Sequence, residues 1–173
     1  QDTNRELPVL SREDLTFVTL PNSYLGSSAR KLYGLWETKD RVTLAELIKP
    51  IPFQRWDNGA QTDAPLYQRP GTDSETLTYE VYMGGDQGET ILRTDRPELP
   101  NALIFGDSFT NIMEPLLFTG FNETRSLDFR HYREKTLAEY IAEYQPDVVI
   151  CIRDESVYFD HSGNGDLGYD PAS

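Results

Sequence analysis

Residues 102–110 read ALIFGDSFT: four apolar residues run directly into Gly106, Asp107 and Ser108. A short apolar run that ends in turn-forming residues is typical of a buried β-strand. The next residues carry apolar side chains at positions 112, 113, 116 and 117, which predicts a helix from Ser108 to about Leu117. The tripeptide Gly-Asp-Ser therefore lies where a buried strand turns into a helix.

The same alternation of strand and helix continues to residue 152. Residues 124–129 and 147–152 read as two more strands, and residues 132–144 as a helix. Within that helix, Leu137, Tyr140, Ile141 and Tyr144 have the spacing of one helical face. A βαβαβ run of this kind predicts an α/β fold with a doubly wound parallel sheet, flanked by helices in three layers. Ligands of such sheets bind at the carboxyl ends of the strands, where Gly106-Asp107-Ser108 falls.

The chain is interpreted as a single domain, residues 1–173, with this βαβαβ core at residues 100–155. An N-terminal arm (residues 1–13) and a tail (156–173) flank it, and residues 50–75, rich in Pro, Gly, Asp and Asn, predict a long loop or β excursion. Residues 15–20, 76–82 and 90–94 have strand character, whereas residues 43–48 fit either a helix or a strand. Residues 22–34 predict a loop with a helical turn.

Composition excludes several classes of function. The net charge is −13 with a pI near 4.5, so the surface repels nucleic acid and anionic lipid. No apolar run approaches the ~20 residues of a membrane-spanning helix. With two histidines, one cysteine and no Gly-x-x-x-x-Gly-Lys loop, we expect neither a zinc site nor a nucleotide phosphate site, and no cofactor. The single cysteine, Cys151, lies among apolar strand residues and is expected to be a buried, inert thiol.

Ser108 has two interpretations. In the first, Gly106 permits a tight turn, and Ser108 or Asp107 caps the helix by accepting hydrogen bonds from its first N–H groups. In the second, Ser108 is a nucleophile beside a helix N-terminus, whose N–H groups stabilise an oxyanion during acyl transfer. A serine nucleophile also needs a base to take its proton. The sequence offers His131 and His161, and neither is marked out by its neighbours.

Two other charged residues accompany the predicted strand ends. Arg130 is a candidate to bind a carboxylate or to stabilise an oxyanion, with a salt bridge to Asp128 or Asp107 as the structural alternative. Asp107 is expected to support the turn by hydrogen bonding rather than to take a proton. Aromatic residues in loop-like stretches suit either packing or stacking on sugar rings: Tyr24, Trp36, Trp56 and Tyr67.

Residues 102–110 resemble the first sequence block of the SGNH hydrolases, in which the serine of Gly-Asp-Ser is the nucleophile. The ordinary partner motif, Asp-x-x-His near the C-terminus, is not matched, because Tyr158 stands where His161 needs its aspartate. A broader resemblance is to the AlgX/AlgJ and DHHW-type branch of polysaccharide O-acetyltransferases. It rests on the order of six segments: 25–30, 82–85, 103–109, 114–117, 127–132 and 145–150.

The resemblance implies an extracytoplasmic, cell-envelope or secreted protein whose Ser108 passes an acetyl group from a donor to a polysaccharide, with a membrane acyltransferase as a possible partner. An esterase using the same serine and a non-catalytic carbohydrate-binding protein are the alternatives. In that branch the acid and base come from an Asp-x-His-Trp stretch upstream of the Gly-Ser loop, and these 173 residues do not contain it. Two interpretations follow: a longer parent protein that carries the pair, or a relative without catalysis.

Overall fold

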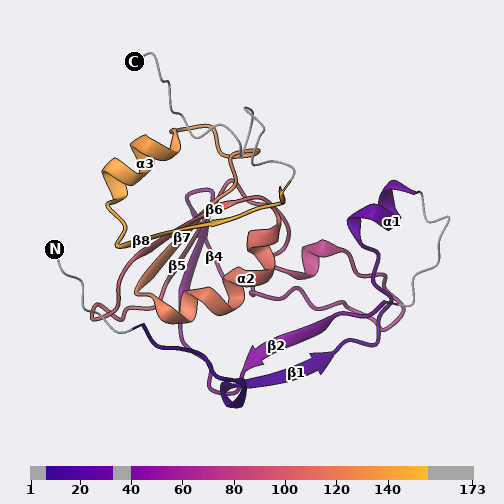
Figure 1. The fold of residues 1–173 in the computed structure, drawn as a ribbon. Helices are drawn as coiled ribbons and strands as arrows, with labels where there is room; N and C mark the ends of the chain where they lie inside the picture. The colour runs from indigo at the N-terminus through magenta and orange to yellow at the C-terminus, as the bar shows by residue number, and fades with distance from the viewer. Residues whose placement is uncertain (1–6, 33–39, 156–173) are drawn as a thin grey trace.

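The computed structural model describes residues 7–32 and 40–155, and shows an α/β fold with two sheets (Figure 1). A six-stranded sheet has the order β4-β3-β5-β7-β6-β8, and β1 and β2 form a separate antiparallel pair. The strands are β1 (Leu15–Thr19), β2 (Thr43–Leu47), β3 (Gln54–Asp57), β4 (Ala60–Thr62), β5 (Glu89–Arg93), β6 (Ala102–Gly106), β7 (Glu123–Leu127) and β8 (Val148–Ile152). The α-helices are α1 (Ser27–Lys31), α2 (Phe109–Leu117) and α3 (Leu137–Tyr144), and 3-10 turns cover Arg12–Asp14, Tyr79–Val81 and Phe118–Gly120.

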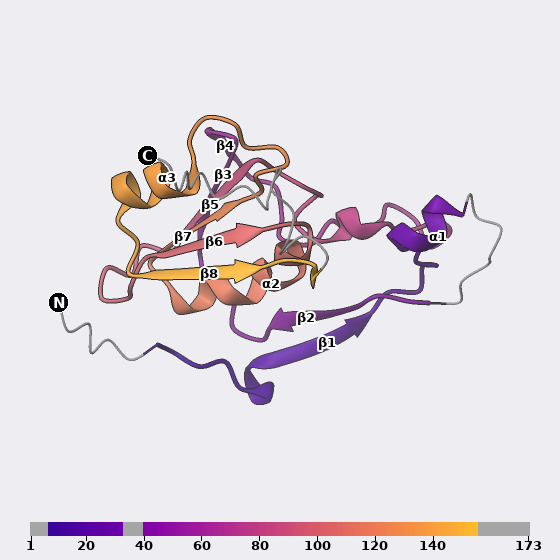
Figure 2. The same cartoon turned by 45° about the horizontal axis from the view of Figure 1, so that its top comes forward.

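The predicted βαβαβ core is confirmed. Strand β6 lies between β7 and β8 and runs parallel to both, and α2 and α3 form the two connections. The helices cover opposite faces of the sheet, as the two views show (Figures 1 and 2). Helix α3 packs Leu137 and Tyr140 against Leu103 and Leu127, whereas α2 bonds to Ser126, which points to the other face. This is the three-layer arrangement that the sequence predicts.

The other half of the large sheet is antiparallel. Strand β5, predicted at residues 90–94, pairs antiparallel with β7, and β3 and β4 extend the sheet beyond it. These two strands come from the long excursion, which is therefore partly β structure. Their hairpin turns through Asn58-Gly59, both with positive φ (49° and 80°), and this dipeptide is a strong signal for a two-residue hairpin.

Two predicted elements differ from the structure. Residues 76–82 form isolated bridges and a 3-10 turn rather than a strand, because the Thr78 hydroxyl accepts from the Glu80 N–H and starts the turn locally. Helix α3 begins at Leu137 rather than at Tyr132, because Thr136 and Glu139 form a capping box there. It ends as predicted, at Gln145 in the left-handed conformation.

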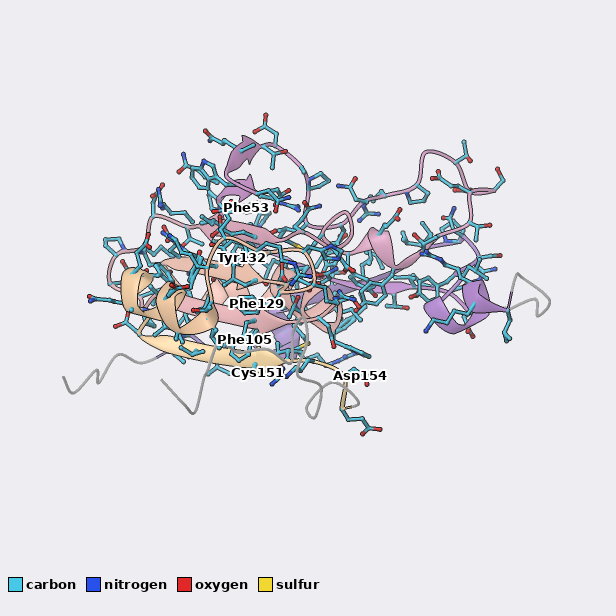
Figure 3. All side chains as sticks on the ribbon, turned by 90° about the horizontal axis from the view of Figure 1, so that it is seen from above. Phe53, Phe105, Phe129, Tyr132, Cys151 and Asp154 are labelled. Atoms are coloured by element: carbon cyan, nitrogen blue, oxygen red, sulfur yellow. The ribbon has the colours of Figure 1, made fainter. Side chains whose placement is uncertain are left out.

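The prediction that Cys151 is buried is wrong. Strand β8 is an edge strand, and Cys151 and the 44% exposed Val149 lie on the α3 face of the sheet. Helix α3 packs over β6 and β7 and leaves this part of β8 uncovered. Seen from above, Cys151 and Asp154 lie at the rim of the molecule, outside the aromatic row of Phe105, Phe129 and Tyr132 (Figure 3).

Helix α2 is confirmed, with its polar side turned inward. Thr110, Asn111 and Glu114 are buried against the sheet, while the apolar Ile112 and Met113 are exposed. None of the helices in the two described ranges combines the length and the apolar character that a membrane crossing requires.

Candidate active site

Gly106 is required by the close approach of β8. A Cβ built on Gly106 would lie 1.6 Å from the Ile152 carbonyl oxygen, which is far inside van der Waals contact. The backbone at Gly106 does not occupy the left-handed region, so the requirement concerns space alone. The strand therefore ends through glycine because its parallel neighbour leaves no room for a side chain at this position.

Asp107 holds the turn that follows. Its Oδ1 accepts from the Phe109 N–H at 3.0 Å, and its Oδ2 accepts from the Asp154 N–H at 2.7 Å. Asp107 is 5% exposed. It therefore caps α2 and ties the start of this helix to the chain that leaves β8, which fixes the backbone on both sides of Ser108.

Ser108 occupies the N-cap position of α2, but its hydroxyl makes no capping hydrogen bond. Of the two capping residues considered from the sequence, Asp107 is the one that caps. Within residues 7–32 and 40–155, neither the hydroxyl nor the backbone N–H of Ser108 has a hydrogen-bond partner, and the side chain is half-buried. Ser108 thus presents a hydroxyl and an adjacent N–H donor on a rigid turn.

Arg130 lies beyond the end of β7, in a fork of two carboxylates. Its Nε is 3.0 Å from both oxygens of Asp128, and its Nη2 is 2.9 Å from Asp86 Oδ2 and also bonds to Asp128. Hydrogen bonding to Asp128 is the main cause that raises the pKa of Arg130. The salt bridge to Asp128 considered from the sequence is present, and the one to Asp107 is replaced by a bond to Asp86.

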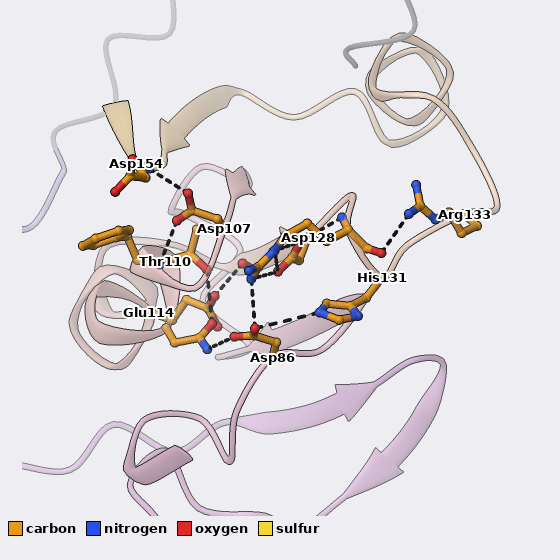
Figure 4. Close-up of polar contacts among 12 residues, drawn as sticks. Asp86, Asp107, Thr110, Glu114, Asp128, His131, Arg133 and Asp154 are labelled. Atoms are coloured by element: carbon orange, nitrogen blue, oxygen red, sulfur yellow. Dashed lines mark hydrogen bonds and ion pairs between the residues drawn. The ribbon is translucent and has the colours of Figure 1, made fainter. Parts of the chain in front are cut away.

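His131 joins the same cluster and is exposed. Its Nε2 lies 3.8 Å from Asp86 Oδ2 (Figure 4). In the described part of the chain, no hydrogen bond connects this imidazole to Ser108. His161 falls outside the described residues. The structure therefore brings His131 together with Arg130 and Asp86, and its role as a base for Ser108 stays a prediction.

Asp86 is the central residue that the sequence analysis missed. It accepts from Asn111 Nδ2 of α2 at 2.9 Å through Oδ1, and from Arg130 through Oδ2. It follows Gly84 and Gly85, which have φ values of 80° and 96°. The signal available in the sequence was this pair of glycines directly before an acid: segment 82–85 contributed to the family resemblance, but Asp86 itself was not considered as a site residue.

Glu114 is a second polar residue that the sequence did not single out. It is 4% exposed and accepts from the Ser126 hydroxyl at 2.6 Å. Burial raises the pKa of the Glu114 carboxyl, because the charged form would lose its hydration between the helix and the sheet. The inner face of α2 therefore carries a chain of polar groups from Asn111 to Glu114, beneath the turn that holds Ser108.

Asp86, Asp128 and His131 have ligand atoms within 4.8 Å of one another, a spacing that a metal ion can use. The Arg130 guanidinium, however, already contacts both oxygens of Asp128 and one of Asp86. These carboxylates thus have their positive partner from the chain itself, and the group is arranged around the Arg130 guanidinium rather than around a metal ion.

Comparison with known proteins identifies the fold. No protein-family profile matches the chain, and no curated protein matches it either. Among solved structures, PatB1 from Bacillus cereus with a sulfonyl adduct superposes with a TM-score of 0.71 at 22% identity, over 90% of this chain and 52% of that one. A second structure of PatB1 gives 0.70 at 21% identity, over 89% of this chain and 53% of that one.

A DHHW family protein from Eubacterium siraeum also shares the fold. It gives a TM-score of 0.64 at 19% identity, over 85% of this chain and 50% of that one. The chain therefore spans about half the length of the solved structures that it matches. At these identities the likeness establishes the α/β fold and no more.

Proposed function

We propose that this chain is an acyl-transfer domain in which Ser108 is the nucleophile. The observation that carries the proposal is the state of Ser108: its hydroxyl and its own N–H have no partner in the described residues, while Asp107 makes the helix cap in its place. A serine kept only as a cap would use its hydroxyl for that bond. A nucleophile needs the hydroxyl exposed and a donor beside it for the oxyanion.

The reaction proceeds in two balanced steps. Ser108 Oγ attacks the carbonyl carbon of an acetyl ester, its proton passes to a base, and the donor's alcohol leaves with a proton. A hydroxyl then attacks the acyl-serine, takes the acetyl group, and returns the proton to Ser108. If that hydroxyl belongs to a sugar the reaction is O-acetylation, and if it belongs to water the same site is an esterase.

The fold supports acyl transfer as the general class. PatB1 is an O-acetyltransferase, and the compared structure of it carries a sulfonyl adduct. The resemblance to polysaccharide O-acetyltransferases extends this to the substrate: we propose a cell-envelope or secreted polysaccharide as acceptor, a separate acetyl donor, a membrane acyltransferase as the partner that supplies it, and an extracytoplasmic location.

A non-catalytic carbohydrate-binding protein is the second candidate. The observation that favours it is that, in the described part of the chain, no imidazole is bonded to Ser108. An acyl transferase in this branch takes its acid and base from an Asp-x-His-Trp stretch, which these residues do not contain. The two candidates therefore differ in whether Ser108 becomes reactive when a base is supplied.

The test is labelling with phenylmethanesulfonyl fluoride, read by peptide mass spectrometry with and without added imidazole as an external base. We expect the adduct on Ser108, formed faster with imidazole, and none in Ser108→Ala. Ser74→Ala is the matched control, because Ser74 is an exposed serine outside the site. Absence of an adduct on Ser108 at any imidazole concentration would favour the binding protein.

A further inference from the structure

The two N–H groups of Arg130 Nη1 have no acceptor in the part of the chain that the structure describes. Nε and Nη2 are both engaged by carboxylates, whereas Nη1 makes no hydrogen bond within residues 7–32 and 40–155. The Arg130 side chain is 40% exposed, and Nη1 is the guanidinium nitrogen that the described residues leave without an acceptor. Hydrogen bonds at Nε and Nη2 fix the plane of the guanidinium, so the two N–H bonds of Nη1 have fixed directions within that plane.

The groups that contact the Arg130 guanidinium are carboxylates, whereas the nearby cation Arg133 bonds to the Arg130 backbone carbonyl instead. Asp86 and Asp128 place two carboxylates on one guanidinium, and Asp107 is close enough to act on it electrostatically. The net charge of the whole chain, which includes these carboxylates, is −13. A further carboxylate at Nη1 would be repelled by these negative charges. A neutral carbonyl or hydroxyl oxygen would not be repelled and would still gain a charge-assisted hydrogen bond.

We propose that Asp86 is the positioning residue of Arg130, and that Nη1 donates to an uncharged oxygen of the substrate. Because Asp86 and Asp128 would repel a uronate carboxylate near Nη1, we expect the sugar that binds at this position to be neutral. This decides between the two uses of Arg130 considered from the sequence: a counter-ion for a carboxylate, or a donor to an acyl or hydroxyl oxygen. This inference rests on the proposed function for the reaction itself. The preference for an uncharged ligand rests on the two carboxylates, Asp86 and Asp128, that contact Arg130.

Asp86 also connects Arg130 to the helix that begins after Ser108. Its Oδ1 accepts from Asn111 in the first turn of α2, and the Asn111 N–H bonds to the Ser108 carbonyl at 3.2 Å. Figure 4 shows Asp86 below Asp128, with His131 to the right of Asp86. One carboxylate therefore fixes the arginine relative to the turn that carries the nucleophile.

The first experiment measures binding at Arg130 without any reaction. Acetate and acetamide have nearly the same shape and differ in charge, so their effects on the Arg130 guanidinium resonances can be compared by NMR. In the native protein we expect acetamide to shift the Arg130 resonances in a saturable way. Acetate should cause no saturable shift of these resonances at the same or lower concentrations. A saturable response of Arg130 to acetate, stronger than the response to acetamide, would overturn the proposal without any variant being needed.

Variants then test Asp86 itself. Asp86→Asn keeps an oxygen acceptor but removes one negative charge, and it should tighten acetate binding at Arg130 about tenfold relative to acetamide, from a unit charge at close range. Asp63→Asn is the matched control, because Asp63 is exposed and lies outside the cluster. An unchanged ratio of the two ligands in folded Asp86→Asn would show that Asp86 does not set the preference.

The acceptor preference is measured in a second assay, with 4-nitrophenyl glucoside and 4-nitrophenyl glucuronide competing for an acetyl group. We expect transfer to the glucoside to be faster by about tenfold, and Asp86→Asn to narrow this ratio. A native protein that prefers the glucuronide would contradict the inference. Failure of Ser108 to accept any acyl group would instead contradict the proposed function, while the acetate and acetamide result would stand.

Discussion

Replacing Gly106 with alanine tests the packing on which the serine turn depends. The added Cβ would lie 1.6 Å from the Ile152 oxygen and 2.7 Å from its carbonyl carbon. Because a Cβ essentially never comes within 3.0 Å of another heavy atom, β6 and β8 must separate there by about 1.4 Å, the difference of the two distances. Both atoms in the way belong to backbone, so no side-chain rotation relieves the contact.

The cost follows from the bonds that this separation breaks. The Asp107 N–H bonds to the Ile152 oxygen at 3.3 Å, and Asp107 Oδ2 accepts from the Asp154 N–H at 2.7 Å. Taking about 1 kcal/mol for the neutral bond and about 2 kcal/mol for the charge-assisted one, Gly106→Ala should lower the free energy of unfolding by about 3 kcal/mol. In a domain of this size the melting temperature should fall by roughly 10 °C.

The assay is urea unfolding followed by circular dichroism, with Gly120→Ala as the control. Gly120 is also buried and outside the left-handed region, but its nearest neighbour to a Cβ is the Pro8 oxygen at 3.9 Å. A loss below about 1 kcal/mol for Gly106→Ala, within the ordinary range of point substitutions, would refute the argument that space decides this residue.

Three further predictions concern the groups around the site. Glu114→Gln should gain stability relative to the native protein as the pH rises from 5 to 8, by more than about 1 kcal/mol in urea unfolding. The reason is that the unfolded carboxyl ionises near its ordinary pKa, while burial raises the pKa of Glu114 in the folded protein. Parallel curves of unfolding free energy against pH for the two proteins would contradict this. Arg55→Lys should lower the unfolding free energy by about 3 kcal/mol, because Arg55 is 2% exposed and its guanidinium bonds to Asp57 and to the Pro65 and Met83 carbonyls at once. A loss under about 1 kcal/mol in urea unfolding would count against this. Cys151 should react with a disulfide reagent such as DTNB in the folded protein about as fast as it does in the unfolded protein, because it is exposed. A thiol that reacts only after unfolding would show that this part of β8 is covered.

The parallel core was predictable because its signals are local. The apolar run before Gly106 and the helical face from Leu137 to Tyr144 each specify an element without help from distant residues. The antiparallel half of the sheet was harder to predict from the sequence, because β3 and β4 are short and polar and are held by pairing with β5. Only the Asn58-Gly59 turn marked them in the sequence.

The site was only partly predictable for a related reason. Ser108, Asp107 and Arg130 follow strand ends, so the topology alone gathers them at one edge. Asp86 reaches this edge through a loop between other elements, and its contacts with Asn111 and Arg130 span 25 and 44 residues. Exposure of Cys151 depends on β8 being an edge strand, which its own apolar sequence does not reveal.

The most direct measurement is rapid-quench mass spectrometry of the protein mixed with 4-nitrophenyl acetate, with imidazole present to take the proton. We predict a transient acetyl group on Ser108, which is lost when a neutral sugar is added and is absent in Ser108→Ala. Acetylation confined to lysines or the N-terminus, with Ser108 unmodified at every time point, would contradict the assignment of Ser108 as the nucleophile.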